Sequence, residues 1–217
     1  LISGTFIARM KIPPFIATLG MMLMLKGLSL IVTGAKPIYF NSTPGFNLIA
    51  QGSLIGAVIP EFPVPNGVLI LFLVAGAVAY VLSRTVLGRY TFALGSNEEA
   101  VRLSGVNTAA WKMAIYALSG AICGIAGVLI ASRINSAQPA LGLGYELEAI
   151  AAVVIGGTSL AGGRGTILGT LIGALIMSVL TNGLRVLSVA PEWQTVVTGA
   201  IIIVAVYADQ LRRGRTV

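Results

Sequence analysis

The stretch MAIYALSGAICGIAGVLIAS, residues 113–132, decides the class of fold. It contains 20 uncharged residues and is bounded by Lys112 and Arg133. An α-helix rises about 1.5 Å per residue, and the hydrocarbon core of a bilayer is about 30 Å thick, so this run is long enough to cross a membrane as one helix. The stretch therefore predicts a transmembrane helix.

The composition of the whole chain indicates that this helix belongs to a helical membrane bundle. Of the 217 residues, 56% are hydrophobic and 10% are charged, whereas a soluble domain carries about 25% charged residues. The 27 glycines suit helices that approach closely inside a membrane. The expected fold is all-α, a polytopic transmembrane bundle that forms a single domain over residues 1–217.

The composition also excludes several kinds of chemistry. The chain has no histidine, Cys123 is its one cysteine, and no lysine is followed by serine or threonine. A His-based catalytic triad, a common zinc site, an intrachain disulfide and a Walker A motif are therefore excluded. We expect no resident metal or cofactor and no ATP hydrolysis by the chain itself, and we interpret Cys123 as a packing residue.

Four further apolar runs approach the length of a span, at residues 15–33, 67–83, 165–184 and 193–208. Residues 149–163 form a shorter run, which Gly156 and Gly157 interrupt, and we predict a short, broken span there. Residues 48–59 are better interpreted as an interfacial or re-entrant segment. Residues 1–8 look like the end of an apolar segment and not like a signal peptide, so we expect that N-terminal helices are missing.

The distribution of Lys and Arg predicts the orientation, because these residues favour cytoplasmic loops. If residues 149–163 cross, three basic residues face outward, Lys36, Arg133 and Arg185. The side taken as cytoplasmic then carries ten, Arg9, Lys11, Arg84, Arg89, Arg102, Lys112, Arg164, Arg212, Arg213 and Arg215.

Residues 34–66 then form an external loop. It holds five prolines, Pro37, Pro44, Pro60, Pro63 and Pro65, and this density predicts a rigid lid or docking surface instead of a continuous helix. Four acids are also external, Glu61, Glu146, Glu148 and Glu192. They either attract a basic soluble partner or merely solvate the loop ends.

The cytoplasmic loop, residues 84–112, contains the organised string GSNEEAVRLSGVN at residues 95–107. Ser96 and Glu99 fit a capping box, which predicts a short helix over residues 97–104 that Gly105 ends in the left-handed conformation. Ala100 and Leu103 share one face of this helix, with Val101 beside them. The helix either lies flat on the bilayer or presses its apolar residues into the bundle or a partner.

This string resembles the coupling loop of ATP-binding-cassette (ABC) importer permeases. IPPFIATLGMMLMLKGLSLIVTG at residues 12–34, SAQPALGLGYELEAIAAVVIGGTSLAGGRGTILGTLIGALI at residues 136–176 and the closing helix resemble the monosaccharide permeases, most closely the ribose type. The resemblance covers nearly the whole chain. It implies that the coupling residues are Gly95, Ser96, Asn97, Glu98, Glu99, Ala100, Val101, Arg102, Ser104 and Gly105.

The resemblance further implies a subunit of about ten spans in the bacterial inner membrane that moves a sugar by alternating access. Its expected partners are ABC ATPase subunits inside, a periplasmic sugar-binding protein outside and a second permease copy. A branched-chain amino-acid permease of the same superfamily is the main alternative. A secondary transporter is less expected, because no Asp or Glu lies in the middle of a span.

Polar residues in or near the spans are the candidates for a sugar pathway. They are Lys26, Tyr116, Asn135, Gln138, Thr158, Ser159, Thr181 and Asn182. Lys26 either faces the pathway or extends its amine toward the membrane surface. The run GGTSLAGGRG at residues 156–165 allows an anion-binding nest or a hinge, but close packing of helix ends is the interpretation that its glycines favour.

Overall fold

The computed structural model describes residues 1–59, 61 and 63–214, so Pro60 and Arg215 lie outside the described residues. The chain forms two compact units. The first unit comprises Leu1–Gly88 and Gly105–Leu141, and the second comprises Arg89–Ser104 and Gly142–Val217. The chain therefore passes from one unit to the other three times.

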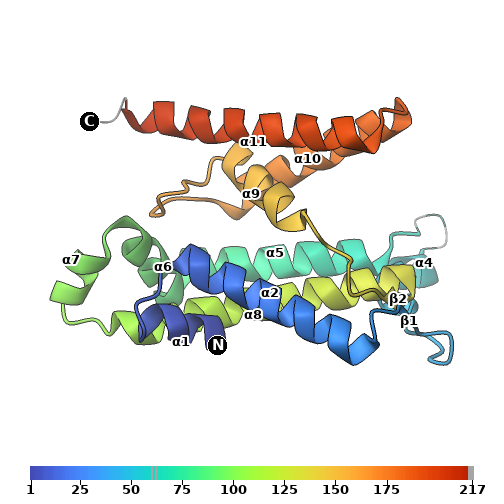
Figure 1. Ribbon diagram of the computed structural model, residues 1–217, viewed down its shortest axis with the longest axis horizontal. Helices are drawn as coiled ribbons and strands as arrows, with labels where there is room; N and C mark the ends of the chain where they lie inside the picture. Colours follow the sequence, from blue (N-terminus) through green and yellow to red (C-terminus); the bar gives the residue numbers. More distant parts are fainter. Residues whose placement is uncertain (60, 62, 215–217) are drawn as a thin grey trace. The chain divides into compact units, whose positions relative to one another are not determined.

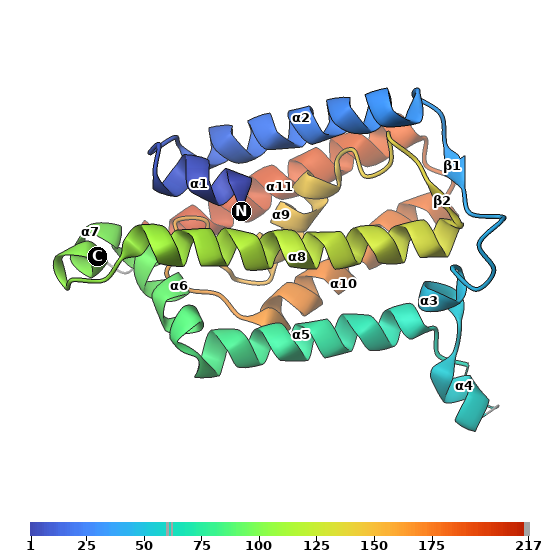
Figure 2. The same ribbon diagram turned by 90° about the horizontal axis from the view of Figure 1, so that it is seen from below.

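Three long helices dominate the first unit, α2 (Pro14–Thr33), α5 (Asn66–Arg84) and α8 (Thr108–Ile134). Figure 2 shows that their axes run in a similar direction. The short helix α1 (Ile2–Ala8) packs against α2 and α8. Gly4 permits this contact, since a Cβ atom there would lie 3.1 Å from the Cα of Met113.

Local signals set the ends of these helices. Pro14 starts α2 at a position where its missing N–H costs nothing, and Gly34 ends it in the left-handed conformation with a φ of +58°. The side chain of Asn107 accepts a hydrogen bond from the amide of Ala110 at 3.1 Å and so caps α8.

The ends of the first unit differ in charge. Arg9 and Lys11 precede α2, Arg84 ends α5, and Lys112 lies in the first turns of α8, all at one end of the unit (Figure 2). Lys36 follows α2 and Arg133 lies in the last turn of α8, at the opposite end. This distribution agrees with the predicted orientation within the first unit.

The end of the first unit that is predicted to face outward carries a small folded platform, called the external platform, built from residues 34–59, 61, 63–66 and 132–138. Strand β1 (Ile38–Tyr39) pairs antiparallel with β2 (Ser136–Ala137). Residues 48–59 form two short helices, α3 (Leu48–Gln51) and α4 (Leu54–Val58), instead of the one predicted segment. Gly52 and Ser53 separate them, and the Ser53 hydroxyl caps α4 by accepting from the amide of Gly56.

Ser132 anchors this platform to α8. Its side chain is fully buried, and its hydroxyl donates to the carbonyl of Phe46 at 2.7 Å and accepts from the amide of Ala50 at 2.9 Å. A buried hydroxyl that satisfies two backbone groups contributes about 1–3 kcal/mol, because its loss leaves both groups unpaired. The external loop is therefore a structured surface, as its prolines predicted.

The second unit is built on α9 (Tyr145–Ile155), which packs against α10 (Ile167–Val186) and α11 (Pro191–Gly214) (Figure 1). Ala151, Ala152 and Met177 form its core. The backbones of α9 and α10 approach so closely that a Cβ atom on Gly173 would collide with the carbonyl oxygen of Ala152.

Among the described residues, five helices are long and apolar enough to cross a membrane, α2, α5, α8, α10 and residues 191–211 of α11. The five predicted spans are thus confirmed. The helix predicted near residues 149–163 begins and ends earlier, since α9 covers Tyr145–Ile155 and is about 16 Å long. It ends at the predicted break, where Gly157 has a φ of +86°.

Candidate coupling segment and membrane pathway

The predicted coupling loop, residues 84–112, contains two helices and not one. Helix α6 (Val86–Ser96) precedes α7 (Glu98–Leu103). The sequence predicted only the short helix over residues 97–104 in this loop, so α6 is an additional element. Gly88 permits a sharp turn after α5, since a Cβ atom there would collide with the carbonyl oxygen of Leu82.

Asn97 caps α7, so the predicted capping box of Ser96 and Glu99 is wrong. Ser96 is the last residue of α6, and the extended backbone that an N-cap requires falls at Asn97, with φ −154° and ψ 96°. The Asn97 side-chain oxygen accepts from the amide of Ala100 at 3.0 Å. Glu99 pairs instead with Arg102 at 2.5 Å, with both side chains 62% exposed. Such a surface pair contributes at most about 1 kcal/mol.

Other features of the predicted helix are confirmed. Gly105 follows α7 with a φ of +82°, in the left-handed region that glycine adopts at low cost. Glu98 and Glu99 lie in the first turn and Arg102 in the last, the order that the helix dipole favours. The helix ends at Leu103, one residue before the predicted end.

Leu103 excludes one of the alternatives left open for this helix. Its side chain is 78% exposed, and Ala100 on the same face is exposed as well. Leu103 therefore does not press into the bundle. The exposed leucine next to charged residues is available to a protein partner or to the bilayer surface, so these two alternatives stay open.

Replacing Asn97 by alanine tests the observed cap. Asn97→Ala should destabilise α7 by about 1 kcal/mol, because the amide of Ala100 loses its acceptor. Hydrogen exchange of the α7 amides should become faster by about fivefold. Asn97→Ser should largely preserve protection, since serine caps equally well. Faster exchange in Ser96→Ala, with no change in Asn97→Ala, would restore the predicted capping box.

The run GGTSLAGGRG, residues 156–165, packs against the end of α6. A Cβ atom on Gly95 would lie 2.8 Å from the amide nitrogen of Gly163, and one on Gly163 would lie 3.1 Å from the Cβ of Ser96. The amide of Ser159 donates to the carbonyl of Arg164 at 3.1 Å and closes the loop. This geometry supports close packing and places exposed Arg164 beside the coupling segment, on the predicted side.

The candidate pathway residues do not converge on one site. Lys26 and Tyr116 lie on α2 and α8, whereas Asn135 and Gln138 belong to the external platform. Thr158 and Ser159 lie in the loop that contacts α6, and Thr181 and exposed Asn182 lie in the outer half of α10. Lys26 is half-buried and, within the described residues, has no ion pair.

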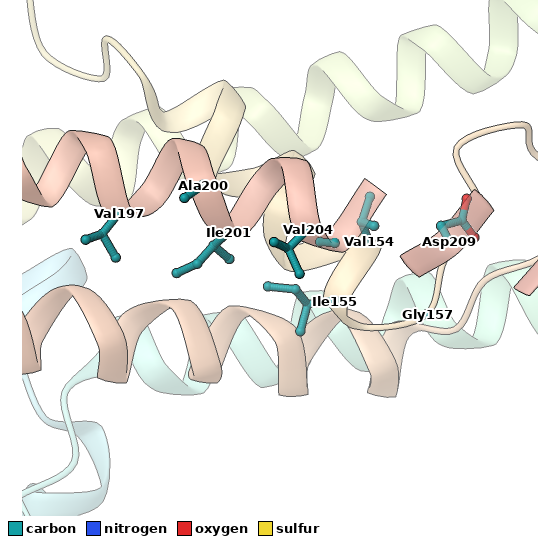
Figure 3. A pocket seen from close by; sticks show the side chains of 9 residues that line it. Val154, Ile155, Gly157, Val197, Ala200, Ile201, Val204 and Asp209 are labelled. Atoms are coloured by element: carbon teal, nitrogen blue, oxygen red, sulfur yellow. The ribbon is translucent and has the colours of Figure 1, made fainter. Parts of the chain in front are cut away.

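A cavity of about 420 Å³ opens between α9 and α11. Figure 3 shows Val154 and Ile155 facing Val197, Ile201 and Val204, with Asp209 at one end. Its walls are almost wholly apolar, and a sugar needs several hydrogen-bonding partners. This cavity therefore does not have the chemistry of a sugar site.

A second cavity, of about 620 Å³, lies among α3, α5 and α8 at the external end of the first unit. Gln51 and Arg133 give it polar groups, although neither was among the predicted pathway residues, and the Gln51 side-chain amide donates to the carbonyl of Arg133 at 2.8 Å. Across the described part of the chain, no three Cys, Asp or Glu residues gather as metal ligands.

Comparison with known proteins identifies the family. The model of the family described as branched-chain amino acid transport system / permease component matches residues 1–206. This chain belongs to that permease family. With its five apolar helices, this member of the family is a multi-pass protein of the inner membrane.

Among curated proteins, this member of the permease family is similar to sugar importers. The ribose import permease of Escherichia coli strain K12 is 44% identical over 98% of this chain and 65% of its own length. The fructose import permease of Rhizobium meliloti is 41% identical over 96% of this chain and 58% of its own. The galactose/methyl galactoside import permease of E. coli K12 is 42% identical over 99% and 64%.

The chain thus spans less than two thirds of the length of these relatives. No solved structure matches it. The family description names a permease component of a transport system, in agreement with the expectation of a transport subunit.

Proposed function

We propose that the protein is the permease subunit of a bacterial ABC importer and carries a monosaccharide across the inner membrane. The observation that carries the proposal is the 41–44% identity to ribose, fructose and galactose import permeases over nearly the whole chain. Ribose is the first substrate to test. The family description names branched-chain amino acids, but the sugar relatives favour a sugar over that alternative.

Helix α7 is the proposed docking element for an ATPase subunit. It has an exposed leucine, a capped N-terminus and a glycine stop, so it enters a complementary groove as a short, rigid rod with little loss of conformational entropy. ATP binding and hydrolysis by two partner ATPases would displace this rod. The displacement would switch the permease between outward-facing and inward-facing states.

The external platform is the proposed docking surface for a periplasmic sugar-binding protein. It presents Tyr39 (62% exposed) and Leu54 (69% exposed), with the acid Glu61 exposed near α4. The β1–β2 pairing and the Ser132 anchor hold it in one shape. Preorganisation of this kind lowers the cost of forming a complex.

A second copy of the subunit completes the proposed pathway. The scattered polar residues support this part of the proposal, because the pathway candidates among the described residues of one chain do not converge on one site. A permease that receives its sugar from a binding protein does not need a tight site of its own. We therefore expect weak contacts with the sugar, spread over both copies.

Uptake by the reconstituted full-length permease tests the function. Proteoliposomes with the cognate ATPase and binding protein should accumulate labelled ribose only when ATP is supplied, and unlabelled fructose and galactose should compete to different degrees. Accumulation of leucine in place of sugars would support the branched-chain alternative. Uptake at full rate without any ATPase would contradict the proposal.

A further inference from the structure

The segment Arg89–Ser104, called here the coupling segment, contains α7 and most of α6 and belongs to the second unit through its contacts. The residues on either side of it in the sequence belong to the first unit. Residues Arg89–Ser104 form one compact body with Gly142–Val217. Helix α5 before the segment and α8 after it belong to the other body. A displacement of α7 therefore has a direct structural route to α9, α10 and α11.

The connection between α6 and the loop before α10 is a close backbone contact among Gly95, Gly162 and Gly163, called here the junction. The end of α6 at Gly95 meets Gly162 and Gly163 in the loop between α9 and α10. A Cβ atom on Gly162 would lie 2.8 Å from the Cα of Gly95. Because backbone meets backbone, no flexible side chain can absorb a displacement.

Both the available space and the conformation require glycine at this junction. Gly162 and Gly163 have φ values of +86° and +79°, which residues with a side chain rarely adopt. Gly95 has helical neighbours within α6, so its requirement comes only from the contact. Close packing without a ligand therefore explains why these three positions lack side chains.

Glycine also stands at each place where the chain passes between the units. The passages fall between Gly88 and Arg89, between Ser104 and Gly105, and between Leu141 and Gly142. Gly105 and Gly142 have φ values of +82° and +89°. Hinges absorb dihedral changes at a few terminal or loop residues, and Gly105 and Gly142 lie in such positions, whereas Gly88 lies within α6.

We infer that Gly95, Gly162 and Gly163 are positioning residues that join α7 rigidly to the α9–α10–α11 unit, so that a force on α7 moves this unit as one body. The hinges are Gly105 and Gly142. The inference rests on the proposed function, in which an ATPase applies the force. It goes further by naming which helices receive the force and through which contact.

A disulfide across the junction tests whether it moves as one body. Ser96→Cys with Gly163→Cys in a Cys123→Ser background places two Cβ atoms 3.1 Å apart, so they must move apart by a few tenths of an ångström to reach the roughly 3.5–4.5 Å found in disulfides. In the complete complex with ATPase and binding protein, oxidation should form the bond. Sugar uptake by the oxidised protein should equal that of the same protein after reduction.

Because Gly163 has a positive φ, the substitutions can lower uptake by themselves, so the comparison of oxidised with reduced protein counts only where the reduced protein retains measurable uptake. Loss of uptake on oxidation, reversed by a reductant, would overturn the inference, because the junction would then have to open during transport. Failure of the bond to form would overturn it as well. If the wild-type complex neither binds an ATPase nor transports, the proposed function fails, while bond formation still reports the packing of the junction.

Gly95→Ala provides the second variant. Alanine favours a helix more than glycine does, so any loss must come from the contact with Gly163. Uptake should fall about tenfold while ATPase association and ATP hydrolysis by the complex persist, which indicates uncoupling. Gly199→Ala in α11 is the control, since a Cβ atom there meets nothing within 4 Å. Unchanged uptake in Gly95→Ala, or loss of ATPase association, would overturn the inference.

Discussion

Gly173→Leu should unfold the second unit at a much lower temperature than the wild type. A Cβ atom at this position would collide with the carbonyl of Ala152 on α9, and the amide of Gly156 also lies within 2.9 Å. Both neighbours are backbone atoms, so the helices must separate. Overpacking typically costs 1–3 kcal/mol, and we expect about 3 kcal/mol here because no side chain is free to move.

The thermal midpoint in detergent measures this effect, and α10 supplies a matched control. Gly183→Leu introduces the same side chain into the same helix at a position where a Cβ atom meets nothing within 4 Å. This control should unfold close to the wild-type midpoint. Equal midpoints for the two variants would show that α9 and α10 do not depend on the close approach at Gly173.

Leu103→Asp should abolish detectable association with the partner ATPase. Leu103 is the one large apolar side chain of α7 and is 78% exposed, so we expect it to fill a pocket of the partner. Loss of such an anchor costs about 2–4 kcal/mol, which corresponds to a weakening of roughly 30-fold to 1000-fold. The affinity of the detergent-solubilised permease for the ATPase measures it.

Two controls sharpen this prediction. Leu103→Met preserves apolar volume and should retain most of the affinity. Leu143→Asp introduces the same charge at a leucine that is 56% exposed in the segment between β2 and α9, on the side predicted to face outward, and should leave ATPase association unchanged. If Leu143→Asp weakened association and Leu103→Asp did not, the assignment of α7 to the cytoplasmic side would be wrong.

Much of the membrane fold could be predicted because it depends on local properties. A run such as residues 113–132 partitions into hydrocarbon whatever surrounds it, so its helix follows from length and hydropathy alone. The glycine stop at Gly105 depends on a single backbone conformation, and it too could be predicted. The coupling residues were located by resemblance, and their role remains a prediction.

The errors arose where two neighbouring elements compete for the same residue. Ser96 is a good cap in isolation, but α6 continues through it and moves the cap to Asn97. Helix α6 itself was not predicted, and its glycines serve contacts and not flexibility. The pathway candidates were chosen by polarity alone, and the polarity of a residue does not determine whether its side chain lies near the others in one binding site.

The sequence by itself determined that this protein is a membrane bundle with five spans and a short polar helix between two of them, because hydrophobic transfer and local helix propensity act over a few neighbouring residues. Only the tertiary structure decided that the Leu103 side chain is exposed, that Ser132 holds the external platform and that Gly95 meets Gly162 and Gly163. These contacts join residues far apart in the chain. They depend on which backbones can approach each other, and no local pattern of polarity or propensity specifies that.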